Sequence, residues 1–491
     1  MVEYLKKEAN TTVTENGAAT HITTESDCLD LFATIGALRH ASDTEIENRF
    51  VRAFMENKDL ATKLLFFARD IRGGLGERRV FRTILRWLAN NAPDTVRKNL
   101  PYVAEYGRYD DLLSLINTPC EKDAAAILKT QFQNDMEHLK NGEAVSLLGK
   151  WLPSVNTSNP ESVANGKKIA RYFGMRNEEY RKALTALRKE IKIIENNLRE
   201  KDYTFDYEKC PSKAMYRYRR AFLRNDGERY SEFLERVNRG EAKMHAEVLY
   251  PYELVASCLD PFDRIRKIDK NEETVLNTTW NALTAFDTEE NMLAVIDTSG
   301  SMYSGTYHPE PAAVALSLGL YCAEHNHGVF HNHFIEFSAT PRLIEIKGDT
   351  FVDRLRYLST FNEIANTNLA AVFDLILDTA VKYELPASEL PTKLIIISDM
   401  EFDYCIYNAD LTNFDYAKKK FESNGYRLPD IVFWNVDSRN THQPVTMNEE
   451  GVALVSGCTP RLFSMVTGDL ASPYDLMMET LSSDRYKVIC A

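Results

Sequence analysis

A group of oxygen-bearing side chains follows a short apolar segment in the second half of the chain. Residues 291–296 read Asn-Met-Leu-Ala-Val-Ile and are followed by Asp297, Ser299 and Ser301. An apolar run that ends in a polar loop is typical of a buried β-strand. Oxygen ligands at alternate loop positions can converge on one point and suit a hard cation such as Mg²⁺. The same residues could instead cap the next helix, so both interpretations stay open.

The segment that surrounds this loop predicts an α/β fold. Strand-like apolar runs recur at 329–337, 342–346, 393–398, 431–436 and 451–456, and helical patterns at 311–323, 351–358 and 369–381. Continuously apolar strands that alternate with helices are typical of a doubly wound parallel sheet. Such sheets bind ligands at the carboxyl ends of the strands where strand order reverses. Asp297 and Asp399 both follow a strand, so we expect both carboxylates at that edge.

The run 297–301, Asp-Thr-Ser-Gly-Ser, resembles the first motif of a von Willebrand factor A domain, the metal-ion-dependent adhesion site. The resemblance covers about residues 288–491 and implies a bound Mg²⁺ or Mn²⁺. It implies direct ligation by two serines and a threonine, and two aspartates that act largely through water. The implied site residues are Asp297, Ser299, Ser301, Thr367 and Asp399. Ala365 and Met400 stand where family members usually carry glycine.

Other chemistries for this loop can be judged by spacing. No lysine follows Gly300, so the loop is not a phosphate-binding P-loop. The residue two positions before Ser299 is Asp297 rather than glycine, which excludes a hydrolase nucleophile elbow. An acidic group at Asp399, Glu401 and Asp403 could supply a second metal or a base for a metal-dependent phosphoesterase. We favour a solvated acidic loop, because no positioned nucleophile accompanies it.

Composition narrows the class of protein. The 491 residues carry a formal charge of -13 and the pI is about 5.4. This acidity excludes a histone-like or polybasic membrane-binding protein, so any nucleic-acid site has to be local. The eight cysteines are scattered without a Cys-x-x-Cys pair, which favours a reducing compartment. The first residues lack a secretory apolar core and no run approaches a membrane span, so we expect a cytoplasmic protein without a membrane partner.

The first half of the chain predicts helices. Residues 1–28 are polar and predict a flexible lead-in, whereas residues 29–287 show helical periodicity, as in Ile46, Phe50 and Phe54. No strand signal precedes the 290s, so we expect stacked helical pairs of the HEAT-like kind. The overall prediction is a multi-domain chain with an α-helical repeat domain at 29–287 and an α/β domain of the von Willebrand factor A type at 288–491.

Positive charge concentrates between residues 167 and 224. One helix is predicted over 180–198 and another after Pro211, each with a basic stripe beside an apolar one. Four cations on one helix line repel one another unless an anion is present, and tyrosines interleaved with them could stack on bases. A solvated basic face is the alternative. The candidate RNA-binding residues are Lys167, Lys168, Arg171, Arg181, Arg188, Lys192, Lys213, Arg217, Arg220 and Arg224, with Tyr172, Phe173, Tyr216 and Tyr218 as candidate stacking residues.

Three local phrases, at 68–78, 107–112 and 150–154, resemble an uncharacterised family of TROVE-like proteins. The order of a helical domain before a von Willebrand factor A domain resembles the Ro autoantigen family. That resemblance implies a ring of helical repeats and binding of small non-coding or misfolded RNA. The glycines at 73, 74 and 76 could cradle a phosphate, but a tight turn between helices is the favoured interpretation.

We therefore predict a non-enzymatic RNA-binding scaffold with one divalent-cation site. The alternative is a Mg²⁺-dependent protein-binding adapter, in which a partner's acidic side chain completes the metal's coordination. A metal-dependent phosphoesterase is the weaker alternative. The histidines at 325, 327, 331 and 333, with Cys322 nearby, form a dense group, but they flank a predicted helix end where cations are favoured. We expect no zinc there.

Overall fold

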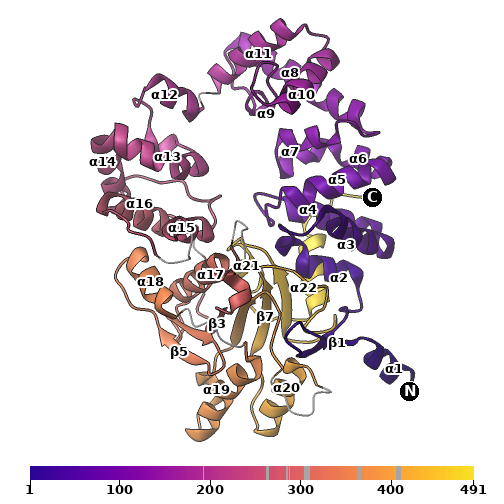
Figure 1. The fold of residues 1–491 in the computed structure, drawn as a ribbon, viewed down its shortest axis with the longest axis vertical. Helices are drawn as coiled ribbons and strands as arrows, with labels where there is room; N and C mark the ends of the chain where they lie inside the picture. The colour runs from indigo at the N-terminus through magenta and orange to yellow at the C-terminus, as the bar shows by residue number, and fades with distance from the viewer. Residues whose placement is uncertain are drawn as a thin grey trace.

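The computed structural model places a helical arc against an α/β domain (Figure 1). It describes residues 1–191, 193–260, 265–283, 286, 288–303, 310–361, 367–404 and 411–491. The arc contains α2 to α16, and the six-stranded sheet lies wholly in the second part. A mostly helical first region before a mainly parallel α/β domain confirms the predicted order. Among the described helices, none is long and apolar enough to cross a membrane.

The helices of the arc pack against their neighbours in chain order. In α3, the Ser42 side chain accepts a hydrogen bond from the Glu45 N–H, and the spacing of Ile46, Phe50 and Phe54 buries one face. The helices are α2 Asp27–Thr34, α3 Asp43–Glu56, α4 Lys58–Arg69, α5 Arg79–Asn91, α6 Pro93–Asn99, α7 Val103–Tyr106, α8 Glu121–Asn141, α9 Leu148–Trp151, α10 Pro160–Phe173, α11 Asn177–Glu190, α12 Ile194–Glu200, α13 Ser212–Asn225, α14 Gly227–Asn238, α15 Pro251–Cys258 and α16 Lys270–Asn281.

The single helix predicted over 180–198 is wrong, because the structure divides it into α11 and α12. Ile193 has φ of -63° and ψ of 137°, an extended conformation that interrupts the helix. Three isoleucines stand within residues 191–194, and β-branched residues lower helix propensity. The apolar spacing continues across the break, so periodicity alone does not reveal it.

The prediction of a flexible lead-in at residues 1–28 also differs from the structure. Helix α1 (Val2–Ala9) is followed by an antiparallel hairpin of β1 (Thr11–Val13) and β2 (Ala19–His21). The hairpin packs on the α/β domain: the Thr14 hydroxyl donates to the Phe402 carbonyl at 2.6 Å, and the His21 N–H donates to the Gln443 carbonyl at 3.0 Å. The hairpin is held by polar residues that bond to distant loops, so it lacks the alternation of apolar and polar residues by which a strand is predicted from sequence.

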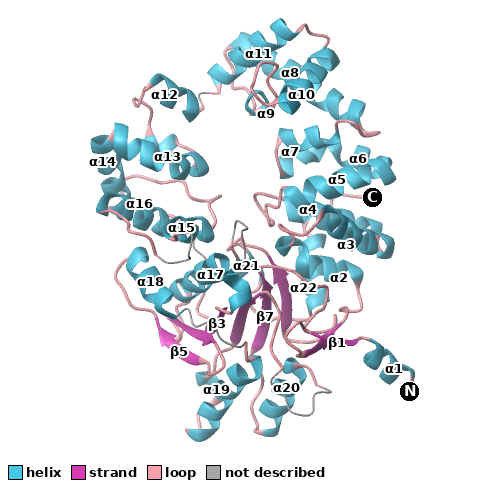
Figure 2. Cartoon of the chain, in the orientation of Figure 1, coloured by secondary structure: helices cyan, strands magenta, loops and turns pink. Residues whose placement is uncertain are grey.

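The sheet of the α/β domain has the strand order β5-β4-β3-β6-β7-β8, and only β5 is antiparallel. Its strands confirm the predicted runs, except that residues 329–332 form a turn before β4; they are β3 Met292–Asp297, β4 His333–Phe337, β5 Arg342–Glu345, β6 Lys393–Ser398, β7 Asp430–Asn435 and β8 Val452–Ser456. Its helices are α17 Pro311–His325, α18 Phe351–Leu358, α19 Leu369–Lys382, α20 Asn413–Ser423, α21 Leu462–Met465 and α22 Pro473–Ser482. Figure 2 shows the sheet between α17 and the pair α19 and α20.

Strand order reverses at β3, which lies between β4 and β6. Alternate residues of β3 enter different cores: Ala294 and Ile296 pack on the α17 side, whereas Leu293 and Val295 pack with α19 and α20. Helices on both faces explain why every residue of β3 and β6 is buried. The carboxyl ends of β3 and β6 therefore meet at the reversal point, where ligands bind in such sheets.

The arc closes at its base through contacts between its two ends and the α/β domain. Arg461, which precedes α21, donates from Nη1 to the Ile71 carbonyl at 2.6 Å and from Nη2 to the Glu247 carbonyl at 2.8 Å. The Tyr250 hydroxyl donates to the Leu75 carbonyl at 3.2 Å. One arginine thus joins the turn after α4 to the segment before α15, and the helices and the α/β domain form a closed ring.

Gly76 is expected to be intolerant of a side chain at this closure. Its φ is +71°, and a Cβ would lie 2.1 Å from the Tyr250 hydroxyl, so Gly76→Ala has to displace Tyr250 and break its bond to Leu75. We expect a loss of about 2 to 3 kcal/mol in unfolding free energy, from left-handed strain and one lost hydrogen bond. Gly174→Ala is the control, because its φ is +75° but nothing lies within 4 Å. Equal losses in urea titrations of both variants would contradict the contact with Tyr250.

Candidate nucleic-acid interface and cation site

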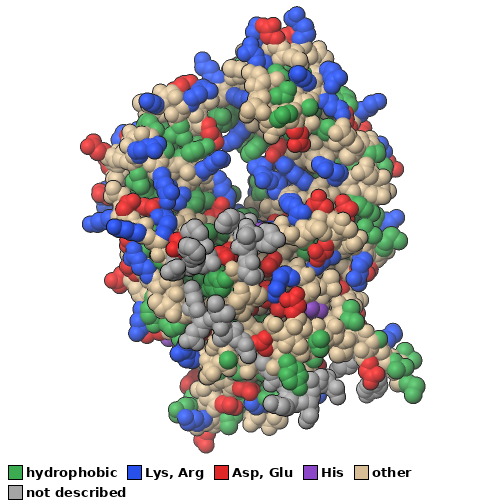
Figure 3. All heavy atoms as spheres, in the orientation of Figure 1, with side chains coloured by type: hydrophobic (Ala, Val, Ile, Leu, Met, Phe, Trp, Pro, Cys, Tyr) green, Lys and Arg blue, Asp and Glu red, His purple; other side chains and the backbone are tan. Residues whose placement is uncertain are grey.

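A basic pocket lies where the arc closes. It has a volume of about 990 Å³ and draws residues from the start of the arc, from its end and from the α/β domain. Its lining includes seven Lys or Arg and three Glu, and the cations are Arg39, Arg69, Arg78, Arg79, Arg108, Lys213 and Arg461. Figure 3 shows Lys and Arg side chains gathered around the hollow at the middle of the molecule. An acidic chain therefore places an excess of positive charge at this junction.

A second pocket of about 920 Å³ continues from the first along the arc. The two share Arg78 and Arg79, and the second adds further cations from α5 and α11, namely Arg82, Arg86 and Arg188. Arg78, Arg82 and Arg86 follow one another at intervals of four residues, which places them along one face at the start of α5. The two pockets form a continuous surface, which we call the basic channel.

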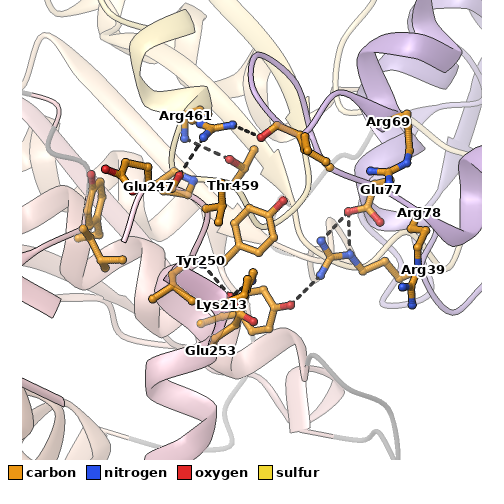
Figure 4. A pocket seen from close by; sticks show the side chains of 18 of the residues that line it. Arg39, Arg69, Glu77, Arg78, Lys213, Glu247, Tyr250, Glu253, Thr459 and Arg461 are labelled. Carbon is orange, nitrogen blue, oxygen red and sulfur yellow. Dashed lines mark hydrogen bonds and ion pairs between the residues drawn. The ribbon is translucent and has the colours of Figure 1, made fainter. Parts of the chain in front are cut away.

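Most of these arginines already have an acidic partner. Arg69 Nε donates to Asp111 at 2.8 Å and Arg82 Nε donates to the same carboxylate at 2.6 Å. Arg39 Nε donates to Glu77 at 2.7 Å, and Figure 4 shows this pair at the wall of the pocket. Partly buried pairs of this kind hold the lining rigidly and leave less charge for a ligand.

Arg78 differs from its neighbours. Within the described part of the chain its side chain has no hydrogen bond or ion pair, and Arg78 is exposed at the junction of the two pockets. Burial of its stem, followed by the positive charges of Arg108 and Arg82, lowers the pKa of Arg78. Like charges that crowd one guanidinium are stabilised by an anion beside it. The geometry therefore favours an anionic ligand at Arg78.

Aromatic rings border the channel at two points. Tyr250 and Tyr252 stack with centroids 5.9 Å apart, and the Lys213 ammonium lies 4.8 Å from the centre of the Tyr250 ring. The Arg108 guanidinium lies 3.9 Å from the centre of the Trp151 ring in the second pocket. Cations that alternate with aromatic faces are typical of surfaces that bind single-stranded nucleic acid.

The structure divides the candidate RNA-binding residues into three groups. Lys213 lines the first pocket and Arg188 lines the second, although Arg188 also donates to the Leu152 carbonyl at 2.7 Å. Lys168 and Arg220 are engaged with Glu121 and Glu272. Exposed residues that line neither pocket are Lys167, Arg171, Arg181, Arg217 and Arg224. Lys192 lies outside the described residues.

The predicted stacking residues are mostly occupied within the fold. Tyr216 donates its hydroxyl to the Glu253 carbonyl at 2.8 Å, and burial raises the pKa of Tyr216 to about 12. Phe173 is buried, and Tyr172 and Tyr218 bond to Glu121 and Glu195. Rings that line the two pockets include Tyr250, Tyr252 and Trp151, although the Tyr250 hydroxyl is also bonded within the fold. Their sequence neighbourhood carries no basic run, which is why periodicity and charge did not single them out.

Four of the predicted cation-site residues, Asp297, Ser299, Ser301 and Asp399, lie together at the carboxyl edge of β3 and β6. The Ser299 N–H donates to Asp297 Oδ1 at 2.9 Å, and the hydroxyls of Ser299 and Ser301 lie 2.9 Å apart. The Ser301 side chain also hydrogen-bonds to Asp399. Asp297 is 1% exposed and Asp399 is 3% exposed. Two buried carboxylates and two hydroxyls thus share one small region.

The electrostatics of this region call for positive charge. Burial, and then the charge of Asp399, raises the pKa of Asp297 to about 7. The pKa of Asp399 is also raised by burial, although the Arg439 guanidinium opposes the rise. A divalent cation would compensate both carboxylates. The oxygen-only donor set and the excess of carboxylates over cations fit Mg²⁺ or Mn²⁺.

Thr367 contacts the loop that follows Asp399: its hydroxyl donates to the Glu401 carbonyl at 3.3 Å, and its carbonyl accepts from the Asp403 N–H at 3.1 Å. Glu401 itself is 2% exposed and accepts from the Glu15 N–H at 2.8 Å and from the Asn440 amide at 2.7 Å. The prediction of a solvated acidic loop is therefore wrong for Asp399 and Glu401. The amino-terminal hairpin covers this loop, and the sequence gives no sign of that contact.

The histidine group flanks the end of α17 and the start of β4. His331 Nδ1 lies 2.7 Å from the Asn326 carbonyl, and His333 Nδ1 lies 2.7 Å from the His331 carbonyl. No set of three or more His, Cys, Asp or Glu side chains within the described ranges has the geometry of a metal site. The expectation that the histidines hold no zinc stays a prediction.

Two family models match the chain. The model described as "Domain of unknown function (DUF2828)" matches residues 14–129 and 156–287, which together make up just over half of the chain. The model described as "Domain of unknown function (DUF7788)" matches residues 291–479. The boundary between the two matches falls between α16 and β3, where the helical arc gives way to the sheet.

One relative spans nearly the whole chain. "Uncharacterized protein L728" of Acanthamoeba polyphaga mimivirus is 27% identical over 511 residues, which cover 96% of this chain and 87% of the relative. Among solved structures, the RO (RSR) protein of Deinococcus radiodurans covers 94% of this chain and 100% of its own, with 14% identity and a TM-score of 0.47. At that TM-score the likeness does not establish a shared fold.

Proposed function

We propose that this chain, which belongs to the family described as domain of unknown function DUF2828, is a non-enzymatic scaffold that binds single-stranded RNA in its basic channel. The observation that carries the proposal is Arg78, whose side chain has no hydrogen bond or ion pair in the described structure and which feels the positive charges of Arg108 and Arg82 more than the negative charges of Asp110 and Asp111. Phosphate is the anion that arginines spaced along one channel would accept repeatedly.

The aromatic borders favour an unpaired strand. Tyr250, Tyr252 and Trp151 line the two pockets, and their rings could stack only on bases whose faces are free. Arginine beside an aromatic ring, as with Arg108 and Trp151, adds a planar cation that can lie against a base or a phosphate. A duplex offers phosphates but no free base faces, so it should bind more weakly.

We also propose that the α/β domain is of the von Willebrand factor A type and holds one Mg²⁺ or Mn²⁺ ion. Asp297, Ser299, Ser301, Thr367 and Asp399 would hold it, and the ion would supply positive charge and an open coordination position. Within the described residues none of these five lines the basic channel. RNA binding should therefore survive removal of the metal.

The experiment that tests this function measures fluorescence anisotropy of labelled RNA across a salt series. A single strand and a perfect duplex of equal length are compared, each with millimolar Mg²⁺ and with chelator. The proposal expects tighter binding of the single strand, a steep dependence on salt, and little effect of chelator. Absence of salt-dependent binding would refute it. Capture of an acidic protein partner that needs Mg²⁺ would instead support the adapter function.

A further inference from the structure

Arg439 joins the candidate cation site to the amino-terminal hairpin. Its Nη2 donates to Asp399 Oδ2 at 2.8 Å, and its Nη1 lies 3.1 Å from Glu15 Oε2. Arg439 follows β7, whereas Glu15 lies in the turn between β1 and β2. One guanidinium therefore links a predicted metal-site carboxylate to a segment from the other end of the chain.

The hairpin holds Glu15 in this position through several backbone contacts. The Glu15 N–H donates to Glu401 Oε2 at 2.8 Å, and the Tyr404 N–H donates to the Asn16 carbonyl at 3.0 Å. The Asn16 amide also donates to the Glu401 carbonyl at 2.6 Å. Since the backbone on both sides of Glu15 is fixed, its carboxylate stays beside Arg439.

Acidic groups outnumber cationic groups in this region. The acidic side chains here are Asp297, Asp399, Asp437, Glu401 and Glu15. Among the described residues, Arg439 supplies the guanidinium that bonds to two of them, Asp399 and Glu15. His442 Nε2 lies 3.0 Å from Glu401 Oε1 and can add a second positive charge when protonated. The pKa of Asp437 is raised, mainly by burial and next by the negative charge of the nearby Asp399. Arg439 is thus the counter-cation of Asp399 in the structure.

We propose that Arg439 is a displaceable internal counter-cation of the metal site, and that Glu15 retains it when a divalent ion binds. The inference rests on the proposed metal site. A divalent ion and a guanidinium near the same carboxylate repel each other, so binding of the ion favours separation of Arg439 from Asp399. The Arg439 side chain is 33% exposed and the Glu15 side chain is 50% exposed, so the pair is open to solvent on one side, which leaves room for this movement.

This arrangement makes metal affinity depend on the hairpin. Binding of the ion costs the bond between Arg439 and Asp399, so the site binds metal more weakly than its oxygen ligands alone would. Glu15 lowers that cost because the guanidinium keeps its bond to this second carboxylate after it leaves Asp399. The amino-terminal hairpin therefore sets the divalent concentration at which the site fills.

The test measures Mn²⁺ binding to the full chain by electron paramagnetic resonance of the free ion. Arg439→Gln should bind Mn²⁺ about tenfold more tightly than wild type, since one nearby positive charge is removed. Arg427→Gln is the matched control, because Arg427 pairs with Asp430 at 3.1 Å on the same domain and is 85% exposed. The control should leave Mn²⁺ affinity unchanged. Melting curves establish that each variant is folded.

Glu15 is tested through its coupling to Arg439. Glu15→Gln should weaken Mn²⁺ binding several-fold in the wild-type background, because the displaced guanidinium loses its second partner. In the Arg439→Gln background the same change should have little effect. An equal effect in both backgrounds would mean that Glu15 acts only through its bulk charge, and it would overturn the part assigned to Glu15.

The outcomes separate this inference from the metal site itself. If wild type and Arg439→Gln are folded and bind Mn²⁺ equally tightly, the site stands and the displaced counter-cation is overturned. If only Arg439→Gln binds, the inference is supported in its strongest form. If neither protein binds Mn²⁺, both the proposed metal site and this inference fail.

Discussion

Replacing Arg78 and Arg86 with glutamine is expected to weaken single-stranded RNA binding about 100-fold without unfolding the protein. Arg78 has no ionic partner in the described structure, and Arg86 makes one long bond of 3.4 Å to the Ser114 carbonyl. Neither change breaks a buried ion pair. Each lost hydrogen bond between a guanidinium and a phosphate is worth about 1.5 kcal/mol or more, so two losses give roughly this factor.

The salt dependence supplies a second measurement on the same variant. Each phosphate contact to a single strand contributes about 0.7 to the slope of log affinity against log salt. The double variant should therefore flatten the slope by about 1.4, measured by anisotropy at several salt concentrations. If the variant lost affinity because it was misfolded, the change in the salt slope would not match the number of phosphate contacts removed.

The matched control removes the same charge from a different surface. Arg217 and Arg224 are exposed on α13 and line neither pocket, so the double change to glutamine there should lower affinity only slightly. The basic stripe of α13 is the surface that the sequence favours, whereas the channel is the surface that the fold favours. If the α13 variant lost more affinity than the channel variant, the interface would lie on the outer stripe.

The difference between these two surfaces shows which part of the proposed RNA-binding site can be predicted from the sequence. Arg78, Arg82 and Arg86 repeat every four residues, so a basic line on that helix was available to sequence reasoning. The segment 167–224 contains more positive charge, so the sequence predicts the RNA-binding residues there. The proposed RNA-binding surface is the row of basic side chains that faces the channel. Which row does so depends on how α5 packs against its neighbours, and helical periodicity does not encode that packing.

The α/β half was more predictable than the arc. Strands such as β3 and β6 are buried on both faces, so they are continuously apolar and can be predicted directly from the sequence. The polar residues at their ends can be predicted in the same way. The hairpin that covers Glu401 was not predictable, because its contacts are hydrogen bonds to backbone groups or side chains of segments far apart in the chain. Arg461 and its two carbonyl partners belong to the same class.

Millimolar Mg²⁺ is expected to stabilise the wild-type chain but not Asp297→Asn. An ion that binds only the folded state adds RT ln(1 + [L]/Kd), which is about 2.7 kcal/mol at a hundredfold excess over Kd. Asp297 accepts from the Ser299 N–H at 2.9 Å and from the Ser398 hydroxyl at 2.5 Å, so asparagine keeps the shape of the site while it removes the charge. Melting curves with Mg²⁺ and with chelator measure the difference.

The same stabilisation should depend on pH. Burial and the charge of Asp399 raise the folded-state pKa of Asp297 to about 7, above its ordinary value of 3.8. Without metal, ionising this carboxyl therefore destabilises the folded chain as pH rises from about 4 to 7. Metal needs the ionised form, so protons compete with it below about pH 7. The Mg²⁺-dependent rise in Tm should be larger at pH 8 than at pH 6.

Asp297→Asn also isolates this titration from the others. In chelator, the wild-type protein should lose more stability than the variant between pH 5 and pH 7.5, since only the wild type ionises a buried carboxyl at position 297 in that range. Asp378→Asn is the control, because Asp378 is 72% exposed on α19 and removal of its charge should leave the metal response unchanged. A Mg²⁺ shift in Asp297→Asn equal to that of wild type, at either pH, would place the bound ion elsewhere on the protein.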